Sequence, residues 1–126
     1  MNHAEYIEKT KGMLTEELLF VIKDAGEAMA VNPAAIKYGD YADEISYCAM
    51  ELKRREEMSK LVEAVKAHAA ENYERGGWDY VVETMDDADI AEEIGKATTV
   101  SGAIRKVGKL AKMLGDYRAE ITAEIF

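Results

Sequence analysis

Two histidines, one cysteine and a short acidic run are the residues whose types could support catalysis or metal binding. His3 and His68 are far apart in the sequence, and His68 has no carboxylate or cysteine partner at metal-site spacing. A zinc site needs three or four convergent ligands. The run Asp86-Asp87-Ala88-Asp89 lacks the central glycine and the final glutamate of an EF-hand loop. We therefore expect no metal site and no cofactor.

Cys48 is the only cysteine and the strongest nucleophile by residue type. It shares an apolar stripe of a predicted helix with Tyr41, Ile45 and Leu52, where a cysteine usually acts as a small buried hydrophobe. The sequence also contains no phosphate loop, dinucleotide fingerprint or nucleophile elbow. It therefore predicts a protein that is not an enzyme and has no catalytic residue.

The only tryptophan, Trp78, raises a separate question, because it follows Gly76-Gly77 inside an acidic stretch. A hydrophobic residue after a glycine helix stop often folds back onto the helix that has just ended. Buried aromatic side chains also supply much of a small core. We predict that Trp78 is buried and structural; the alternative is that it belongs to a ligand-binding site.

Carboxylates in and after this stretch form a candidate acidic surface for binding a partner. Some of them lie at predicted helix starts, where they would cap free amides and suit the helix dipole. The acidic surface can therefore be functional or only structural and solubilising. Its members are Glu71, Glu74, Asp79, Glu83, Asp86, Asp87, Asp89, Glu92 and Glu93.

Two basic clusters stand out in this acidic chain. One is Lys53-Arg54-Arg55, and the other, a candidate basic face of the last helix, is Arg105, Lys106, Lys109 and Lys112. By default such clusters are solvated faces paired with neighbouring glutamates. The functional alternative is contact with an acidic partner or with a phosphate backbone.

The composition narrows the class of protein. The chain has 126 residues, of which 48% are hydrophobic, and one proline, which favours a packed helical domain over disorder or sheet. A net charge of -9 makes nucleic acid an unsuitable main partner. There is no signal peptide or membrane-spanning run, and a single cysteine cannot form an internal disulfide, so we expect a cytoplasmic protein with no membrane partner.

The elements that would position these residues are helices. Predicted N-caps are Thr15 (with Leu14 packing onto Leu19), Asp40, Asp86 and Thr99, and predicted stops are Gly76-Gly77 and Gly95. Asn32-Pro33 ends the first helix and suits the start of a short helical turn. The pattern predicts an all-α bundle of about five to six helices with a long C-terminal helix.

The sequence constrains the domain organisation less than it constrains the helix ends. We predict an N-terminal helical module over residues 1–57 and a C-terminal helical module over residues 58–126, which share one core. Residues 41–75 contain either one helix or two, since Ser59 can cap a separate helix but nothing before it breaks one.

The predicted last helix carries a long apolar stripe with alternating spacings of three and four residues. A helix of about 25 residues is longer than the body of a domain this small, so its far end would remain uncovered. We expect the surplus residues to form a homodimer interface; the alternative is a monomer whose earlier helices cover the stripe. The candidate interface residues are Leu114, Tyr117, Ile121 and Ile125, with Phe126 at the end of the chain.

Two stretches resemble known groups of proteins. "TEELLFVIKDAGEAMAVNP" with "YADEISYCAMELKRR" is similar to small proteins of unknown function in tailed bacteriophages and prophages. "VEAVKAHAAENYERGGWDYVVETMDDADI" with "TTVSGAIRKV" resembles a second such group. The resemblance implies a phage or prophage origin and transfers no active site.

The leading functional hypothesis is a non-catalytic protein that binds a host protein or complex, as an anti-defence inhibitor of the anti-CRISPR kind, through an acidic surface. The first alternative is an accessory factor in phage DNA metabolism or regulation that contacts DNA through the basic face. The second alternative is a helical dimer with a structural or assembly role.

Overall fold

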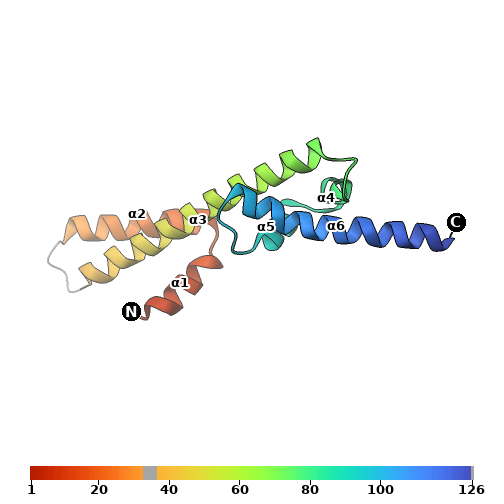
Figure 1. The fold of residues 1–126 in the computed structure, drawn as a ribbon. Coiled ribbons are helices and arrows are strands. Elements are labelled where there is room, and N and C mark those ends of the chain that lie inside the picture. The colour runs from red at the N-terminus through yellow and green to blue at the C-terminus, as the bar shows by residue number, and fades with distance from the viewer. Residues whose placement is uncertain (33–36, 126) are drawn as a thin grey trace. The chain divides into compact units, whose positions relative to one another are not determined.

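The computed structural model describes residues 1–32 and 37–125, and within them the chain forms six helices and no strand (Figure 1). The predicted all-α fold with a long C-terminal helix is confirmed. Pro33, which the sequence assigned to a short helical turn, and Phe126 lie outside the described residues. The helices are α1 His3–Lys11, α2 Thr15–Val31, α3 Tyr38–Glu71, α4 Trp78–Thr84, α5 Asp87–Ile94 and α6 Val100–Ile125.

The chain divides into two compact units, Met1–Glu56 and Glu57–Phe126, with the division inside α3. We call them unit 1 and unit 2. The 34-residue α3 is one uninterrupted helix, which answers the question left open for residues 41–75. Ser59 lies in its interior and Asp40 in its first turn, so neither is an N-cap as predicted. No proline or glycine interrupts α3 after Gly39, which explains its length.

The first helix, α1, was not predicted. Its N-cap is Asn2, whose side-chain oxygen accepts a hydrogen bond from the amide of Glu5 at 3.1 Å. Asparagine is among the best N-cap residues, so Asn2 indicates this helix start in the sequence. The apolar periodicity of the helix is weak, and only Thr10 is buried.

The start of α2 differs from the prediction by one residue. Leu14 is the N-cap, and its amide donates to the carboxylate of Glu17 at 3.0 Å. Thr15 is the first helical residue, and its hydroxyl accepts a hydrogen bond from Arg55 instead. Leu14 and Leu19 are 63% and 53% exposed, so neither belongs to the core, and packing between them stays a prediction.

Unit 1 has a small core formed by Leu18, Ala25 and Cys48, which are at most 2% exposed. The Cys48 thiol lies 3.7 Å from the Tyr6 hydroxyl, and burial raises the pKa of both groups. Cys48 therefore stays a thiol near neutral pH and behaves as the buried hydrophobe that its position predicted.

A buried carboxylate on α3 holds the arginine that joins the helices of unit 1. Glu51 is 4% exposed and accepts two hydrogen bonds from Arg54 and one from Arg55 at 2.6–2.9 Å. The Arg55 guanidinium also donates to the carbonyls of Thr10, at 3.2 Å, and Met13, at 2.5 Å. Arg55 thus ties the end of α1 and the following turn to α3, and two members of the basic cluster, Arg54 and Arg55, have a structural role.

We expect Glu51→Gln to destabilise unit 1 by about 2 kcal/mol at neutral pH, because it leaves two guanidinium groups without their carboxylate. The hydrogen bond from Arg54 lowers the pKa of the Glu51 carboxyl in the folded state. The stabilisation is therefore complete above the unfolded pKa of about 4.3 and is lost as the pH falls through the lower folded value.

Amide hydrogen exchange of peptides from α1 and α2 measures this effect. The difference between the parent and Glu51→Gln should shrink as the pH falls below about 4. Glu27→Gln, at an exposed position of α2, is the control and should exchange like the parent. A difference that persists unchanged in acid would rule out the carboxylate as its source.

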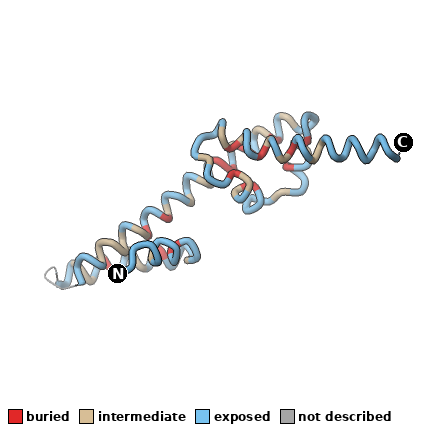
Figure 2. Tube along the Cα trace, turned by 60° about the horizontal axis from the view of Figure 1, so that its bottom comes forward, coloured by how far each residue is buried: buried red, intermediate tan, exposed pale blue. Residues whose placement is uncertain are grey.

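Unit 2 contains a continuous hydrophobic core. The shorter helices α4 and α5 pack against α6, and the second part of α3 contributes to the same cluster (Figure 2). The buried members are Leu61, Val62, Val65, Ala69, Trp78, Val81, Ile90, Ile94, Ala103, Val107 and Ala111. The prediction that Trp78 is buried is confirmed, since it is 9% exposed.

Three helix ends of unit 2 follow the predicted signals, whereas α3 ends at Glu71, five residues before the predicted stop at Gly76-Gly77. Asp86 and Asp89 form a reciprocal capping box at the start of α5, and Thr99 caps α6 by accepting from the Gly102 amide at 3.0 Å. Gly95 ends α5 with a φ of 60°. These three boundaries confirm the sequence prediction.

Gly77 permits the closest contact between two segments of unit 2. Its φ is 82°, and a Cβ atom built on it would lie 1.9 Å from the carbonyl oxygen of Ala111. A Cβ on Gly115 would likewise lie 3.1 Å from the Gly77 amide nitrogen. The two glycines let the turn before α4 lie directly on α6, which places Trp78 in the core.

None of the helices in the described part of the chain has the length and apolar character needed to cross a membrane.

Candidate protein-binding surface

The candidate acidic residues lie on several elements of unit 2, and intramolecular contacts engage most of those on α4 and α5. Asp79 pairs with Arg118, and Asp87 pairs with Lys66 at 3.0 Å. Glu83 accepts a hydrogen bond from the Tyr73 hydroxyl. Together with the Asp86–Asp89 capping box, these contacts give five of the nine carboxylates a structural partner.

The other four acidic candidates are Glu71, Glu74, Glu92 and Glu93. They make no ion pair or side-chain hydrogen bond within the described ranges. Glu71 ends α3 and Glu74 follows in the turn, whereas Glu92 and Glu93 lie on α5. They do not form one dense acidic patch.

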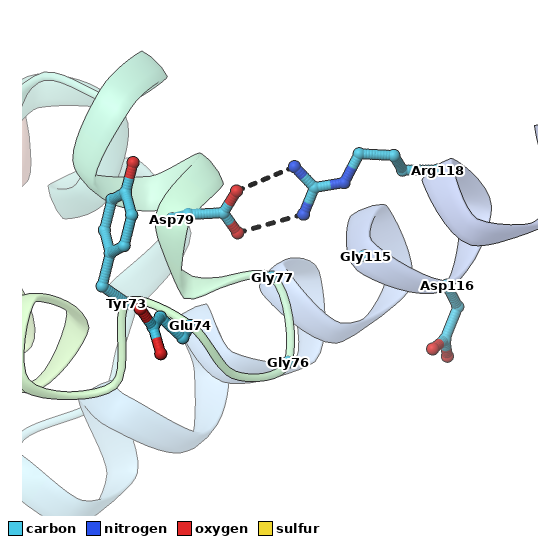
Figure 3. Close-up of a pocket in the computed structure, with 8 residues that line it drawn as sticks. All are labelled: Tyr73, Glu74, Gly76, Gly77, Asp79, Gly115, Asp116 and Arg118. Atoms are coloured by element: carbon cyan, nitrogen blue, oxygen red, sulfur yellow. Dashed lines mark hydrogen bonds and ion pairs between the residues drawn. The ribbon is translucent and has the colours of Figure 1, made fainter. Parts of the chain in front are cut away.

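The Asp79–Arg118 pair lines a hollow of about 420 Å³ at the glycine turn (Figure 3). The two guanidinium nitrogens donate to the two carboxylate oxygens at 2.8 and 3.0 Å. The hydrogen bond from Arg118 lowers the pKa of Asp79, and the contact with Glu83 raises the pKa of Tyr73. Asp79 is thus held ionised and Tyr73 protonated, and neither is a suitable general base or acid near neutral pH.

The same hollow was not predicted as a unit. Asp79 was a candidate residue of the acidic surface, but Arg118 was not a candidate for any site. Arg118 is 39 positions away, on the face of α6 that meets α4. Sequence spacing gives no signal for such a pair, since it depends on how α4 and α6 pack. Asp116 also lines the hollow, but its side chain points away from the ion pair (Figure 3).

Residues able to bind a metal do not converge. No group of three or more histidine, cysteine or acidic side chains within residues 1–32 and 37–125 could hold a metal ion. His68 packs edge-on against Trp78, with ring centroids 4.8 Å apart. Its role in this position is packing within the core of unit 2.

The four candidate basic residues of α6 are all exposed. Arg105, Lys106 and Lys109 line a hollow of about 320 Å³ beside Thr98 and Thr99. None of these three cations forms an ion pair within the part of the chain that the structure describes. Lys112 differs from them, because it pairs with Asp116 at 3.0 Å.

The last ten described residues of α6 differ from the rest of unit 2, because every one from 116 to 125 is exposed (Figure 2). We call residues 116–125 the α6 arm. Three large apolar side chains lie on it: Tyr117, Ile121 and Ile125, which are 61%, 38% and 69% exposed. Leu114, just before the arm, is partly buried. The four candidate interface residues therefore lie on one helix and remain accessible to a partner.

Burial along the apolar stripe of α6 decreases toward the C-terminus. Ala103 and Val107 are fully buried, Leu110 and Leu114 are partly buried, and Tyr117 and Ile121 are exposed. Since all six have the spacing of a helix-packing stripe, the stripe continues beyond the helices that cover it within unit 2. Leu110 and Leu114 also line a hollow of about 430 Å³ together with residues of α4 and α5 and with Met85, which follows α4.

Comparison of the chain with models of known protein families, with curated proteins and with solved structures gave no match.

Proposed function

We propose that the protein is a non-catalytic binding protein that holds another protein through the α6 arm. The observation that carries this proposal is the exposed apolar face of the arm, formed by Tyr117, Ile121 and Ile125. A contiguous apolar surface on a protein usually marks an interaction site. A partner that covers this face would bury these apolar side chains.

The chemistry of the arm fits a protein partner better than a small molecule. Its apolar residues form a ridge on a single helix, whereas small ligands usually occupy concave sites that surround them. An amphipathic helix typically pairs with another helix or enters an apolar groove, with anchors at spacings of three and four residues. Leu114, Tyr117 and Ile121 have this spacing.

The resemblance to small phage proteins supports a host protein or complex as the target, and inhibition of a defence complex as the purpose. The unpaired carboxylates Glu92 and Glu93 lie beside Leu110 and Leu114, so they would add acidic charge next to the apolar surface. This combination favours a partner with an apolar groove and a basic margin.

Capture from an extract of the cells in which the protein is made tests this function. We expect the immobilised parent to retain a specific partner, and Tyr117→Asp to lose at least nine-tenths of it, because a carboxylate would be desolvated in the interface. Phe20→Asp is the matched control, since Phe20 is 66% exposed on α2. Equal retention by Tyr117→Asp and the parent would refute the arm as the binding element.

A second candidate function is contact with DNA through the basic face of α6. The observation that favours it is the group of three cations, Arg105, Lys106 and Lys109, which have no carboxylate partner in the described ranges and line one hollow. Such a group can contact backbone phosphates, although the net charge of -9 opposes extended binding.

Gel retardation of duplex DNA at low salt tests this candidate. If the basic face binds, replacing its three cations by glutamine should abolish retardation. Replacing Lys23, Lys37 and Lys96 by glutamine changes the net charge equally and should leave retardation intact. Absence of retardation by the parent protein would exclude DNA contact through this face.

A further inference from the structure

We propose that the partner of the α6 arm is the α6 arm of a second copy, packed antiparallel about a two-fold axis. This inference rests on the proposed binding role of the arm and makes a second copy, in place of a host protein, the partner that covers it. Two independent features of α6 support it: the order of its apolar residues and the order of its charges.

The apolar residues of α6 are self-complementary in an antiparallel pair. Two contacts with a second copy share one centre of symmetry, which lies between residues 115 and 116. They are Leu114 against Tyr117 and Leu110 against Ile121. One two-fold axis therefore satisfies both contacts at once, as an isologous interface requires. Each contact pairs a partly buried leucine with an exposed residue of the arm.

The surface around the two leucines can receive these side chains. Leu110 and Leu114 lie in the hollow of about 430 Å³ that α6 forms with α4 and α5. In the proposed register, the exposed Tyr117 and Ile121 of the second copy would lie over this hollow. The interface thus joins the most exposed part of one stripe to the partly covered part of the other.

The charges along one edge of this stripe also favour the antiparallel direction. Lys106 and Lys109 lie toward the N-terminal end of the edge, and Glu120 and Glu124 lie toward its C-terminal end. None of the four forms an ion pair within the described part of its own chain. In an antiparallel helix pair an edge meets its own copy in reverse, so the lysines of each chain face the glutamates of the other.

A parallel pair gives no such match. It would set this edge against the opposite edge of the second helix, which carries Ala111, Arg118 and Ile125 and no carboxylate. Lys106 and Lys109 would then gain no partner. The two directions can therefore be distinguished by charge exchange as well as by cross-linking.

Sedimentation equilibrium of the full chain at micromolar to about 100 µM concentration measures the association. We expect the parent to form a dimer of about 28 kDa from the 14.0 kDa chain. Ile121→Asp should remain near 14.0 kDa, and Phe20→Asp should dimerise like the parent. Circular dichroism and Trp78 fluorescence that match the parent would show that each variant is folded.

Charge exchange tests the proposed edge. Replacing Lys106 and Lys109 by glutamate, or Glu120 and Glu124 by lysine, should weaken dimerisation at least tenfold in each case. An equimolar mixture of the two variants should recover the dimer, because an all-negative edge then meets an all-positive one. Failure of the mixture to recover would overturn the charge assignment.

Cysteine cross-linking tests the direction. Leu110→Cys combined with Ile121→Cys should give a disulfide-linked dimer, since these positions face each other. Ile121→Cys alone should not, because the two copies of residue 121 would be about 16 Å apart along the antiparallel axis. The parent, whose Cys48 is buried, is the oxidation control. Efficient cross-linking of Ile121→Cys alone would show a parallel pair and overturn the inference.

The two proposals fail in different ways. A parent chain that stays at 14.0 kDa at the highest concentration overturns self-association, while capture of a different protein that depends on Tyr117 preserves the binding function of the arm. Loss of both results removes both proposals. A dimer that Ile121→Asp does not affect places the interface outside the α6 arm and overturns this inference.

Discussion

Replacing Gly77 by alanine is expected to destabilise unit 2 by about 4 kcal/mol. Two effects act in the same direction. The φ of 82° is unfavourable for a residue with a Cβ atom, and the new Cβ would lie 1.9 Å from the carbonyl oxygen of Ala111. Because that oxygen belongs to the backbone of α6, the turn before α4 would have to move away from the helix.

Gly76→Ala is the matched control for this experiment. Gly76 precedes Gly77 and also has a positive φ, 52°, but a Cβ atom on it would have no neighbour within 4 Å. It should cost only about 1 kcal/mol, from backbone conformation alone. Urea unfolding followed by Trp78 fluorescence measures both variants. Equal destabilisation of the two would mean that the contact with α6 contributes nothing.

Replacing Trp78 by alanine is expected to destabilise unit 2 by about 3 kcal/mol or more. Trp78 is 9% exposed and packs against the His68 ring. Its indole also lies close to Gly108: a Cβ atom built on Gly108 would be 3.2 Å from it. No smaller side chain can make these contacts together. The substitution should therefore leave a cavity that the surrounding helices fill only in part.

Far-ultraviolet circular dichroism during urea unfolding measures this change, since the variant lacks the fluorescent residue. Tyr80→Ala is the control: Tyr80 is close in sequence, aromatic and 38% exposed, and its loss should cost less than 1 kcal/mol. If Trp78→Ala unfolds like the parent but no longer binds a partner, Trp78 belongs to a binding site despite its burial.

The sequence predicted the parts of the fold that depend on local chemistry. Asp86, Thr99 and Gly95 mark helix ends because a capping side chain or a glycine acts within three or four residues of itself. The stripe of α6 was also readable, since its spacing directly reports a helix face. Trp78 is buried as predicted, although the two glycines before it precede α4 and do not end α3.

Contacts between distant segments could not be predicted in the same way. Arg118 meets Asp79, and Arg55 meets Thr10 and Met13, only because helices pack in a particular register. The two misplaced caps have a related cause. Thr15 is engaged by Arg55, 40 positions later, and α3 begins at Tyr38, three residues before the start that a cap at Asp40 predicts.

The candidate binding surfaces show the same difference between local features and contacts with distant segments. The acidic residues were identified from the sequence, but the partners of three of the nine, Lys66, Tyr73 and Arg118, were not. The apolar residues of the C-terminal helix were identified as surplus from helix length alone. In the structure, the side chains of Tyr117, Ile121 and Ile125 are exposed to solvent, as that argument required.

The guanidinium of Arg55 has a consequence for the way the chain is made. It holds the carbonyl of Met13 from 42 positions downstream, while the nine residues of α1 are too few to form a stable helix alone. A ribosome adds about 5–20 residues per second, so about 2–8 s pass between the synthesis of Met13 and that of Arg55. The first helix of the protein therefore cannot gain this contact before Arg55 has been made, and until then it is open to chaperones and proteases.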